Sequence, residues 1–539
     1  MIPFIETATR LFSFSRTRER DIPARLFWAF VAADAVALAV VLAVYLRMWP
    51  PHEDEALALF VGRSSLPHVL HTVVAVRGGA PLHFLLAWAV VHLGGGLTAL
   101  RAVSLFFAVA SVPAMAGLGA RLTDRVTGVV GAVLASWTWV LLFQGVFGRM
   151  YSLFLFTSTL SFLALVVALD RGGRRRFGLW AVAILAALAS HPYAVLVLGA
   201  QALYVVLRRE RLRASLITLA AIAVAATPFW YADVVLRGRF GVGVGGGGSR
   251  LGSPHAVAHY FWWVAGDFSA GHREWSTPVL LVAGAGFGLL VLRRRWSALL
   301  TGCVVVVPAI AFMLAKLNAT ASPEARHLIF ALPFYSLLLA TPIVAASRLR
   351  PPLTDAVALA AVAVLVLGEV HWAHAKTPPL FDGEPVAAAH ARAQASAWLA
   401  ARSRSDDVLL GYEPVYIGAW ERDRQLSRHV LPRADPKLLA DALRSVPEPL
   451  GRGVWVFDAS DSTNGPYKRP TIRFELPLPR DDFVGRAFGP FLVIISRRPL
   501  GTRAHYLTVA ESVMQVGRTL HIGDADINLH ALLGAAKRL

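Results

Sequence analysis

The chain has 539 residues, of which 56% are hydrophobic and only 16% are charged, a composition that predicts several membrane spans rather than a soluble enzyme. The formal net charge of +19 could suggest a nucleic-acid partner, but the excess arginine lies in short clusters between apolar stretches, which is typical of cytoplasmic loops. We therefore expect no nucleic-acid partner. A single cysteine excludes an intrachain disulfide and a cysteine-based zinc site.

The front of the chain predicts a signal anchor followed by an outer loop. Residues 1–25 are basic and lead into an apolar stretch long enough to cross a bilayer, so we expect an uncleaved anchor behind a cytoplasmic segment. The loop at 47–80 then lies outside the cell. An inward N-terminus places this loop outside, but counting the apparent spans back from the cytoplasmic cluster at 171–176 places it inside. One of three apolar stretches therefore does not cross the membrane, and the sequence does not show which: 81–97, 102–120 or 126–143.

Arginine clusters set the topology of the remaining spans. If all of them are cytoplasmic, the apolar stretches between them alternate consistently. These clusters lie at residues 171–176, 208–213, 293–295 and 348–350. Residues 26–373 are therefore predicted to form one polytopic α-helical module of about 11 to 13 spans. A glycine run at 241–248, between two spans, is interpreted as a flexible tether because it lacks the lysine of a phosphate loop.

The tail at residues 374–539 has shorter apolar runs, more charge and more proline, which predicts a separate soluble domain outside the cell. Its helices are expected at 385–401 and 436–444. Its strands are expected at 408–410, 453–458 and 491–496. Helices that alternate with strands indicate a small α/β domain.

Three consecutive carboxylates, Glu53, Asp54 and Glu55, follow the Trp-Pro-Pro sequence that ends the first span. Like charges packed near a low-dielectric surface raise one another's pKa and favour a poised general base. The alternative is a solvated loop without a chemical role. Spacing alone favours neither interpretation.

Two arginines and a histidine lie beside predicted spans. Arg149 and Arg326 stand where an unpaired guanidinium is costly, and such a group can hold a phosphate through two parallel hydrogen bonds. The alternative is interfacial snorkelling of the side chain. His191 occupies the tip of a short apolar hairpin, where it could bind sugar hydroxyls or phosphate, or only pack.

A metal site is not predicted, although several histidines flank the carboxylates. These are His52, His68, His71 and His83. None forms a histidine–glutamate pair with helical ligand spacing. A magnesium or manganese ion held by oxygen ligands leaves weaker sequence traces and stays open.

The order of four short motifs carries a family resemblance. They are Asp54-Glu55-Ala56, Gly148-Arg149-Met150-Tyr151, Ser190-His191-Pro192-Tyr193 and Glu324-Ala325-Arg326-His327. This succession resembles that of the membrane glycosyltransferases of the C-type (GT-C) fold, in particular bacterial relatives of the protein O-mannosyltransferases and aminoarabinose transferases. Phe147 replaces a glutamate that is common in relatives. A common histidine is also missing near Ala80, which leaves His83 as its substitute.

The resemblance implies an inverting enzyme that moves a sugar from a polyprenyl-phosphate donor to an acceptor hydroxyl at the outer face of the cell membrane. The acceptor would be a glycan, a lipid or a protein. Asp54 would be the catalytic base with Glu55 as its neighbour, and Arg149 and Arg326 would hold the donor phosphate. The substrate-binding residues would be His191, Tyr193, Tyr151 and His83. No nucleotide cofactor is implied, and the tail resembles the periplasmic domains of such enzymes.

Two other classes of protein stay open. A membrane transporter would also have several spans with charged residues such as Asp34 and Arg149 at membrane depth, although the sequence shows no internal repeat of interrupted spans. A non-catalytic assembly protein of the cell envelope is the third class. For such a protein Asp54 would be dispensable.

Overall fold

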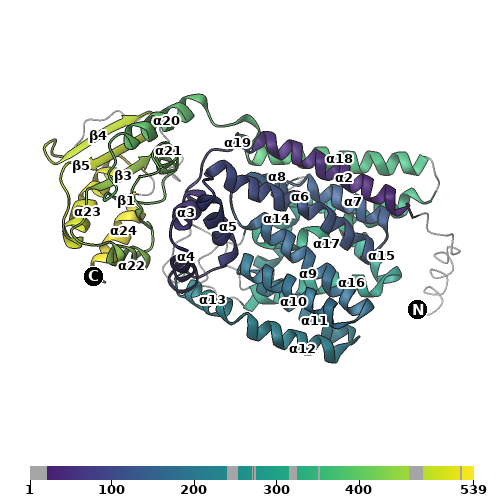
Figure 1. Ribbon diagram of the computed structural model, residues 1–539. Coiled ribbons are helices and arrows are strands. Elements are labelled where there is room, and N and C mark those ends of the chain that lie inside the picture. The colour runs from purple at the N-terminus through teal and green to yellow at the C-terminus, as the bar shows by residue number, and fades with distance from the viewer. Residues whose placement is uncertain are drawn as a thin grey trace.

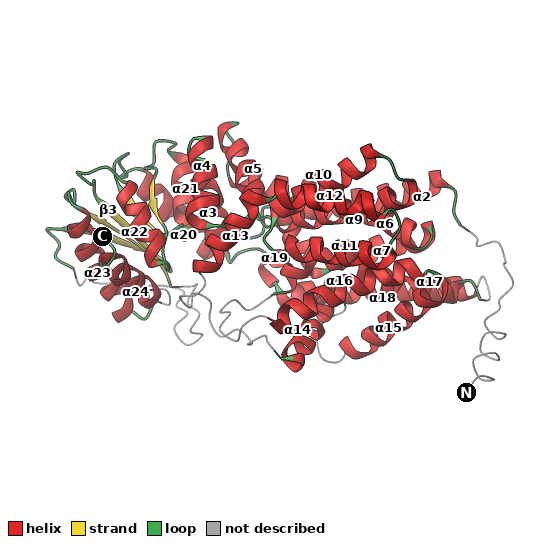
Figure 2. Cartoon of the chain, turned by 90° about the horizontal axis from the view of Figure 1, so that it is seen from below, coloured by secondary structure: helices red, strands yellow, loops and turns green. Residues whose placement is uncertain are grey.

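The computed structural model describes residues 21–239, 253–269, 271, 275–314, 324–349, 353–459, 478–522 and 525–539. Most of the predicted N-terminal segment and the whole glycine run therefore lie outside the described residues. The described chain forms a helical body with an α/β domain at one end (Figure 1). A second view shows the same arrangement (Figure 2).

Seven described helices are long and apolar enough to cross a membrane. They are α2 (Ala24–Tyr45), α6 (Leu97–Leu122), α9 (Tyr151–Arg171), α15 (Ser276–Arg293), α16 (Arg295–Leu314), α17 (Leu332–Ser347) together with the preceding η3 (Ala325–Ala331), and α18 (Leu353–Lys376). Two bent pairs bring the number to nine: α7 (Arg125–Ser136) with α8 (Trp139–Val146), and α12 (Leu212–Ala225) with α13 (Thr227–Arg239). Shorter helices complete the body: α10 (Arg174–Ser190), α11 (Ala194–Arg208) and α14 (Pro254–Asp267). The protein is a multi-pass membrane protein.

Two buried carboxylates accept hydrogen bonds from residues at the 62° bend between α7 and α8. The Asp34 carboxylate on α2 accepts hydrogen bonds from Ser136 Oγ (2.8 Å) and Trp137 Nε1 (3.1 Å). The Glu369 carboxylate on α18 accepts one from the backbone N–H of Trp139 (3.2 Å). Polar groups at a helix break inside a membrane must find partners within the protein. Asp34 therefore supports this bend.

Helix α5 (Pro81–His92) shows which of the three apolar stretches does not cross the membrane. Its 12 residues measure about 18 Å, too short to cross a hydrocarbon core of about 30 Å. The turn after it contacts the α/β domain, where the Arg424 guanidinium donates to the carbonyl of Gly94 (3.4 Å). The stretch at 81–97 is thus the one that does not cross. It belongs with the other short elements of the first loop, which are α3 (Glu53–Gly62), α4 (Leu66–His71) and the π-helix η1 (Thr72–Arg77).

The α/β domain is built on a five-stranded sheet with strand order β2-β1-β3-β5-β4. Its strands are β1 (Val408–Leu410), β2 (His429–Leu431), β3 (Gly453–Asp458), β4 (Phe483–Phe488) and β5 (Phe491–Ser496). Strand β1 is parallel to β2 and β3, whereas β5 is antiparallel to β3 and β4. The helices are α20 (Val386–Ala400), α21 (Pro414–Arg422), α22 (Pro436–Ser445), α23 (Arg503–Thr519) and α24 (Ala525–Ala536). The short α19 (Pro378–Asp382) precedes them and buries Leu380 in the core of the helical body.

The two faces of the sheet bury different partners. On one face, Trp455 and Ile494 pack with residues of α22, α23 and α24. On the other, Val456 and Ile495 belong to a buried cluster that takes in α20 and α21 and continues into the first loop of the body, where it includes Leu59 of α3. Alternation of side chains along a strand produces this division. The domain therefore shares a hydrophobic core with the loop that carries the three carboxylates.

Arg63, just after α3, holds the loop and the domain together. Its guanidinium donates to the carbonyls of Leu426 (2.5 Å) and Ser427 (3.1 Å) and lies 5.5 Å from the ring centroid of Trp420. Hydrogen bonds from a charged donor contribute about 1.5–3 kcal/mol. We expect Arg63→Met to loosen this contact and to speed protease cleavage between the body and the domain. The exposed Arg404 offers the control, because Arg404→Met should leave the cleavage rate near that of wild type. Equal rates for the two variants would contradict this role of Arg63.

Candidate active site

The first turn of α3 presents the carboxylates at a capped helix terminus. His52 is the N-cap residue, and its Nδ1 accepts a hydrogen bond from the backbone N–H of Asp54 (3.1 Å). The Glu55 carboxylate accepts from the backbone N–H of His52 (3.1 Å), which completes a capping box. The positive end of the helix dipole stabilises carboxylates in this position.

Glu55 is fully buried, and its oxygens are engaged by the protein. Arg101 of α6 donates to both of them (2.8 and 2.6 Å), and the backbone N–H of Gly148 donates to one (2.8 Å). Arg101 also donates to the carbonyls of Trp49 (2.7 Å) and Pro50 (2.9 Å). Glu55 therefore joins α3, α6 and the segment before Arg149 into one rigid unit.

Glu53 points toward the α/β domain. Its carboxylate pairs with the guanidinium of Arg433 (Arg433 Nε to Glu53 Oε2, 3.1 Å), which also pairs with Glu413 (2.5 Å). The three consecutive carboxylates thus have three different surroundings. Asp54 is the one that faces the cationic side chains of the helical body.

Asp54 and Arg149 form an ion pair that is only partly open to solvent. Arg149 Nη1 lies 3.1 Å from Asp54 Oδ1, and the two side chains are 13% and 29% exposed. Arg149 lies between α8 and α9, where its own carbonyl accepts from Ser104 Oγ (3.2 Å). The Nε of Arg149 is buried and has no hydrogen-bond partner in the described structure, so a donor is left for a ligand.

Arg326 and its neighbours complete a cluster from three distant parts of the chain. The Arg326 guanidinium lies 5.2 Å from the ring centroid of Tyr151 and pairs with Glu324 (2.7 Å), and its buried Nε has no partner in the described structure. The next residue, His327, stacks on Tyr193, with ring centroids 4.9 Å apart. The start of η3 is therefore joined to the start of α9 and to the α10–α11 hairpin.

His191 lies within this aromatic cluster. Its ring stacks on Phe154 (4.7 Å) and lies 5.3 Å from the ring of Tyr151 and 6.0 Å from that of His327. His83 of α5 is also buried, and its Nε2 has no hydrogen-bond partner in the described structure. Its charge neighbours are Arg149 and Asp54. All eight residues predicted from the sequence thus lie at or directly behind this site.

The pKa of Asp54 is set by opposing effects. Burial raises the pKa of the carboxyl, but nearby positive charges outweigh burial and hold the pKa below its ordinary value. Among the guanidinium groups Arg149 has the largest effect, followed by Arg326 and Arg77. Arg77 ends the π-helix η1, and its guanidinium lies 5.8 Å from the ring centroid of Tyr412 in the α/β domain. Asp54 is therefore an ionised proton acceptor near neutral pH.

The carboxylates do not fit a divalent cation. Glu55 is taken by Arg101 and Glu53 by Arg433, so Asp54 would be left as a single carboxylate ligand beside a guanidinium. Within the described residues, no three histidine, cysteine, aspartate or glutamate side chains gather as a metal site would require.

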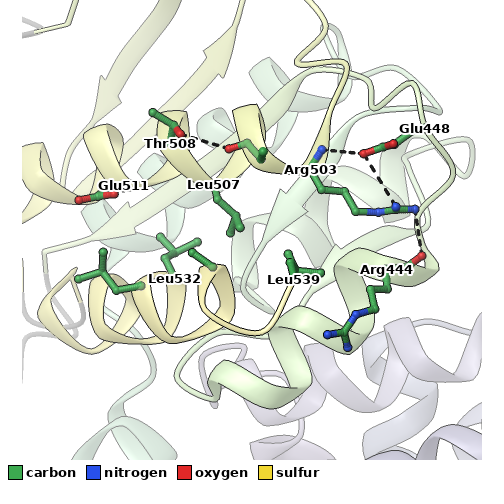
Figure 3. A pocket seen from close by; sticks show the side chains of 11 residues that line it. Arg444, Glu448, Arg503, Leu507, Thr508, Glu511, Leu532 and Leu539 are labelled. Carbon is green, nitrogen blue, oxygen red and sulfur yellow. Dashed lines mark hydrogen bonds and ion pairs between the residues drawn. The ribbon is translucent and has the colours of Figure 1, made fainter.

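A cavity of about 600 Å³ lies elsewhere, among α22, α23 and α24 of the α/β domain (Figure 3). Arg503 points across it toward Glu448, but its guanidinium also donates to the carbonyls of Leu443 (3.0 Å) and Val446 (2.9 Å) and so caps the end of α22. Leu507, Leu532 and Leu539 form its apolar wall. Its arginines serve the fold, and we assign the chemistry to the Asp54 site.

Sequence reasoning missed the supporting residues Arg101, His327, Arg77 and Arg433. Arg101 had a usable signal, because a charged residue at the edge of an apolar helix needs a partner. His327 stood beside a predicted arginine. Arg433 had no signal, since it reaches Glu53 across 380 residues of sequence.

No protein-family model matches the sequence, and no curated protein matches it. Solved structures do. ArnT from Cupriavidus metallidurans bound to undecaprenyl phosphate is similar, with a TM-score of 0.53 and 12% sequence identity. The match covers 88% of this chain and 98% of that chain, and the apo state of ArnT gives the same values. An oligosaccharyltransferase of Archaeoglobus fulgidus gives a TM-score of 0.49 at 11% identity over 80% of this chain and 69% of that chain. The helical body, its capped acidic loop and this likeness to ArnT together show that the protein has the GT-C fold.

Proposed function

We propose that the protein is an inverting glycosyltransferase that transfers a sugar from a polyprenyl-phosphate donor to an acceptor hydroxyl. The observation that carries this proposal is the Asp54–Arg149 pair, in which a proton acceptor lies beside guanidinium groups that still have donors to give. The similar ArnT structure binds undecaprenyl phosphate, which supports a lipid-phosphate donor.

Asp54 accepts the proton of the acceptor hydroxyl as the oxygen attacks the anomeric carbon. The bond from that carbon to the phosphate oxygen breaks, and the polyprenyl phosphate leaves with the bonding electrons. This single displacement inverts the anomeric configuration. A positioned general base contributes about 10²- to 10⁴-fold to the rate.

Arg149 and Arg326 stabilise the negative charge that grows on the departing phosphate. Their unsatisfied Nε donors are positioned before the reaction, so little reorganisation is needed. His83, His191, Tyr151 and Tyr193 bind the sugar and shield the site from water. The α/β domain selects the acceptor, since its Tyr412 lies against Arg77 of the first loop.

The site is proposed to lie at the outer face of the cell membrane. The arginine clusters at the ends of α9, α11 and α15 gather at the other end of the body, which fits the cytoplasmic face. The α/β domain and the acidic loop then lie together outside the cell.

The test uses membranes that contain the full-length protein and radiolabelled polyprenyl-phosphate sugars. Arg149→Ala should lower transfer about 10²- to 10³-fold, the usual effect of removing a charge-stabilising donor. The exposed Arg175 provides the control, and Arg175→Ala should transfer at the wild-type rate. Solute uptake by proteoliposomes without any sugar transfer would overturn the proposal in favour of a transporter.

The lowered pKa of Asp54 predicts the pH dependence of transfer. The carboxylate stays ionised, and able to accept a proton, until the pH falls below the ordinary aspartate value of about 3.9. Arg149→Gln removes the positive charge that lowers the pKa of Asp54 most, whereas the burial that raises this pKa remains. We therefore expect the acidic limb of the rate profile to move to higher pH in the residual activity of Arg149→Gln. Rates measured from about pH 4 to 8 test this, and an unmoved limb would contradict it.

A further inference from the structure

Two adjoining cavities lie at the end of the helical body opposite the Asp54 site. Tyr151, at the start of α9, belongs to that site, whereas Asp170, near the end of α9, lines one of these cavities. A rise of 1.5 Å per residue puts about 28 Å of helix between them. The second cavity adjoins the first because Arg295 lines both. Whatever binds here does not touch the proposed chemistry.

The first cavity, of about 290 Å³, is cationic. Five arginines and one aspartate line it: Arg121, Arg208, Arg293, Arg294, Arg295 and Asp170. Arg208 is neutralised by Asp170 (2.9 Å) and Glu210 (2.5 Å). The exposed Arg293 and Arg295 keep the cavity positive, and an arginine-lined pocket is well suited to a phosphate group.

Trp296 marks the depth of this cavity. Its ring centroid lies 4.6 Å from the guanidinium of Arg295 and 5.6 Å from that of Arg208. Tryptophan prefers the headgroup level of a bilayer, where its apolar body and polar N–H are both accommodated. The arginines therefore lie at the level of lipid phosphates.

The second cavity, of about 390 Å³, is an apolar groove among α11, α15 and α16. Its lining on α16 runs from Arg295 to Val306, which corresponds to about 16 Å of helix. Half of a hydrocarbon core of about 30 Å has the same length. The groove thus accommodates one acyl chain of the leaflet whose headgroups lie at Trp296.

We propose that these cavities form a binding site for an anionic phospholipid of the leaflet opposite the Asp54 site. The phosphate binds Arg293 and Arg295, and one acyl chain lies in the groove against Leu299 and Cys303. The headgroup cavity distinguishes this site from the general lipid contact of a spanning helix, because it adds recognition of charge to apolar burial.

The head-group test measures phospholipid retained by the purified full-length protein in native mass spectrometry. Phosphatidylglycerol should remain bound, and at least tenfold more phosphatidylcholine should be needed for equal occupancy. The variant Arg293→Gln/Arg295→Gln should need about tenfold more phosphatidylglycerol than wild type. Arg174→Gln/Arg175→Gln removes two exposed charges from the first turn of α10 and should bind as wild type does.

The groove test uses a glycine. A Cβ added to Gly302 would meet only Phe287 Cζ, at 4.0 Å, so Gly302→Leu fills the groove without a backbone clash. It should weaken phosphatidylglycerol binding at least fivefold. Gly288→Leu on α15 is the control, because a Cβ there meets no atom within 4 Å.

Several results would overturn the proposal. If phosphatidylcholine is retained as well as phosphatidylglycerol, the cavity does not recognise the charge of the headgroup. If the Arg174→Gln/Arg175→Gln control binds as weakly as Arg293→Gln/Arg295→Gln, the effect comes from the overall surface charge. Displacement of the lipid by millimolar inorganic phosphate, or unchanged binding in Gly302→Leu, would show a free-anion site rather than a lipid site. None of these measurements depends on sugar transfer.

Discussion

Asp54→Asn is expected to lower sugar transfer about 10²- to 10⁴-fold, because the amide cannot accept the proton of the acceptor hydroxyl. The substitution keeps the size of the side chain and leaves the capping of α3 intact, since His52 and Glu55 form the capping box. Donor binding should persist, because Arg149 and Arg326 are unchanged. Initial rates at saturating donor, together with the affinity for the polyprenyl phosphate, measure the two effects separately.

The neighbouring carboxylate provides the matched control for Asp54. Glu53→Gln removes the same charge one residue earlier, but Glu53 faces Arg433 of the α/β domain rather than Arg149. We expect its transfer rate to stay within about threefold of wild type, as for a partly exposed ion pair. Full activity in Asp54→Asn, or equal losses in the two variants, would remove Asp54 as the base.

Arg101→Gln is expected to destabilise the folded protein strongly. It leaves the carboxylate of Glu55 buried without its charged partner, and breaking a buried ion pair in this way costs about 3–5 kcal/mol. Glu55 also accepts a hydrogen bond from the backbone N–H of Gly148, the residue before Arg149. When Glu55 loses its partner and shifts, Arg149 should therefore lose its position as well. The thermal unfolding midpoint of the purified protein and the transfer rate should both fall.

A double variant distinguishes the effect of an unpaired buried charge from the effect of losing the hydrogen bonds of the two side chains. In Glu55→Gln/Arg101→Gln neither buried position carries a charge, so much of the stability should return relative to Arg101→Gln. Activity should stay low, because two neutral amides do not reproduce the bonds to Trp49 and Pro50. A midpoint as low as that of Arg101→Gln would argue against the ion pair as the cause.

The α/β domain shows what local sequence can and cannot predict. The buried strands β1, β3 and β5 have the predicted bounds, since uninterrupted apolar runs identify strands covered on both faces. Strands β2 and β4 and helices α21, α23 and α24 were not predicted. Strand β4 carries exposed and half-buried residues between its two phenylalanines, as suits an edge strand, and its sequence resembles a loop.

The candidate site was predictable where a short motif carried it. Asp54, Arg149, His191 and Arg326 each lie in such a motif, and the structure places them together. The role of Glu55 was not predictable, because its partner Arg101 lies on another helix and a carboxylate beside a candidate base has the same local pattern whether it reacts or supports. The number of membrane crossings in the front of the chain was not predictable for a related reason. Apolar composition does not distinguish α5 from a span, whereas the 12-residue length of the helix does.

The core shared by α3 and the sheet has a consequence for the order in which the protein is made. Leu59 and Phe60 emerge from the ribosome hundreds of residues before Val456 and Ile495, against which the same cluster packs. This part of the first loop must therefore wait, with apolar side chains uncovered, until the last third of the chain has been synthesised. Contacts of such long sequence separation form late. The first loop synthesised is thus among the last parts of the protein to reach its final structure.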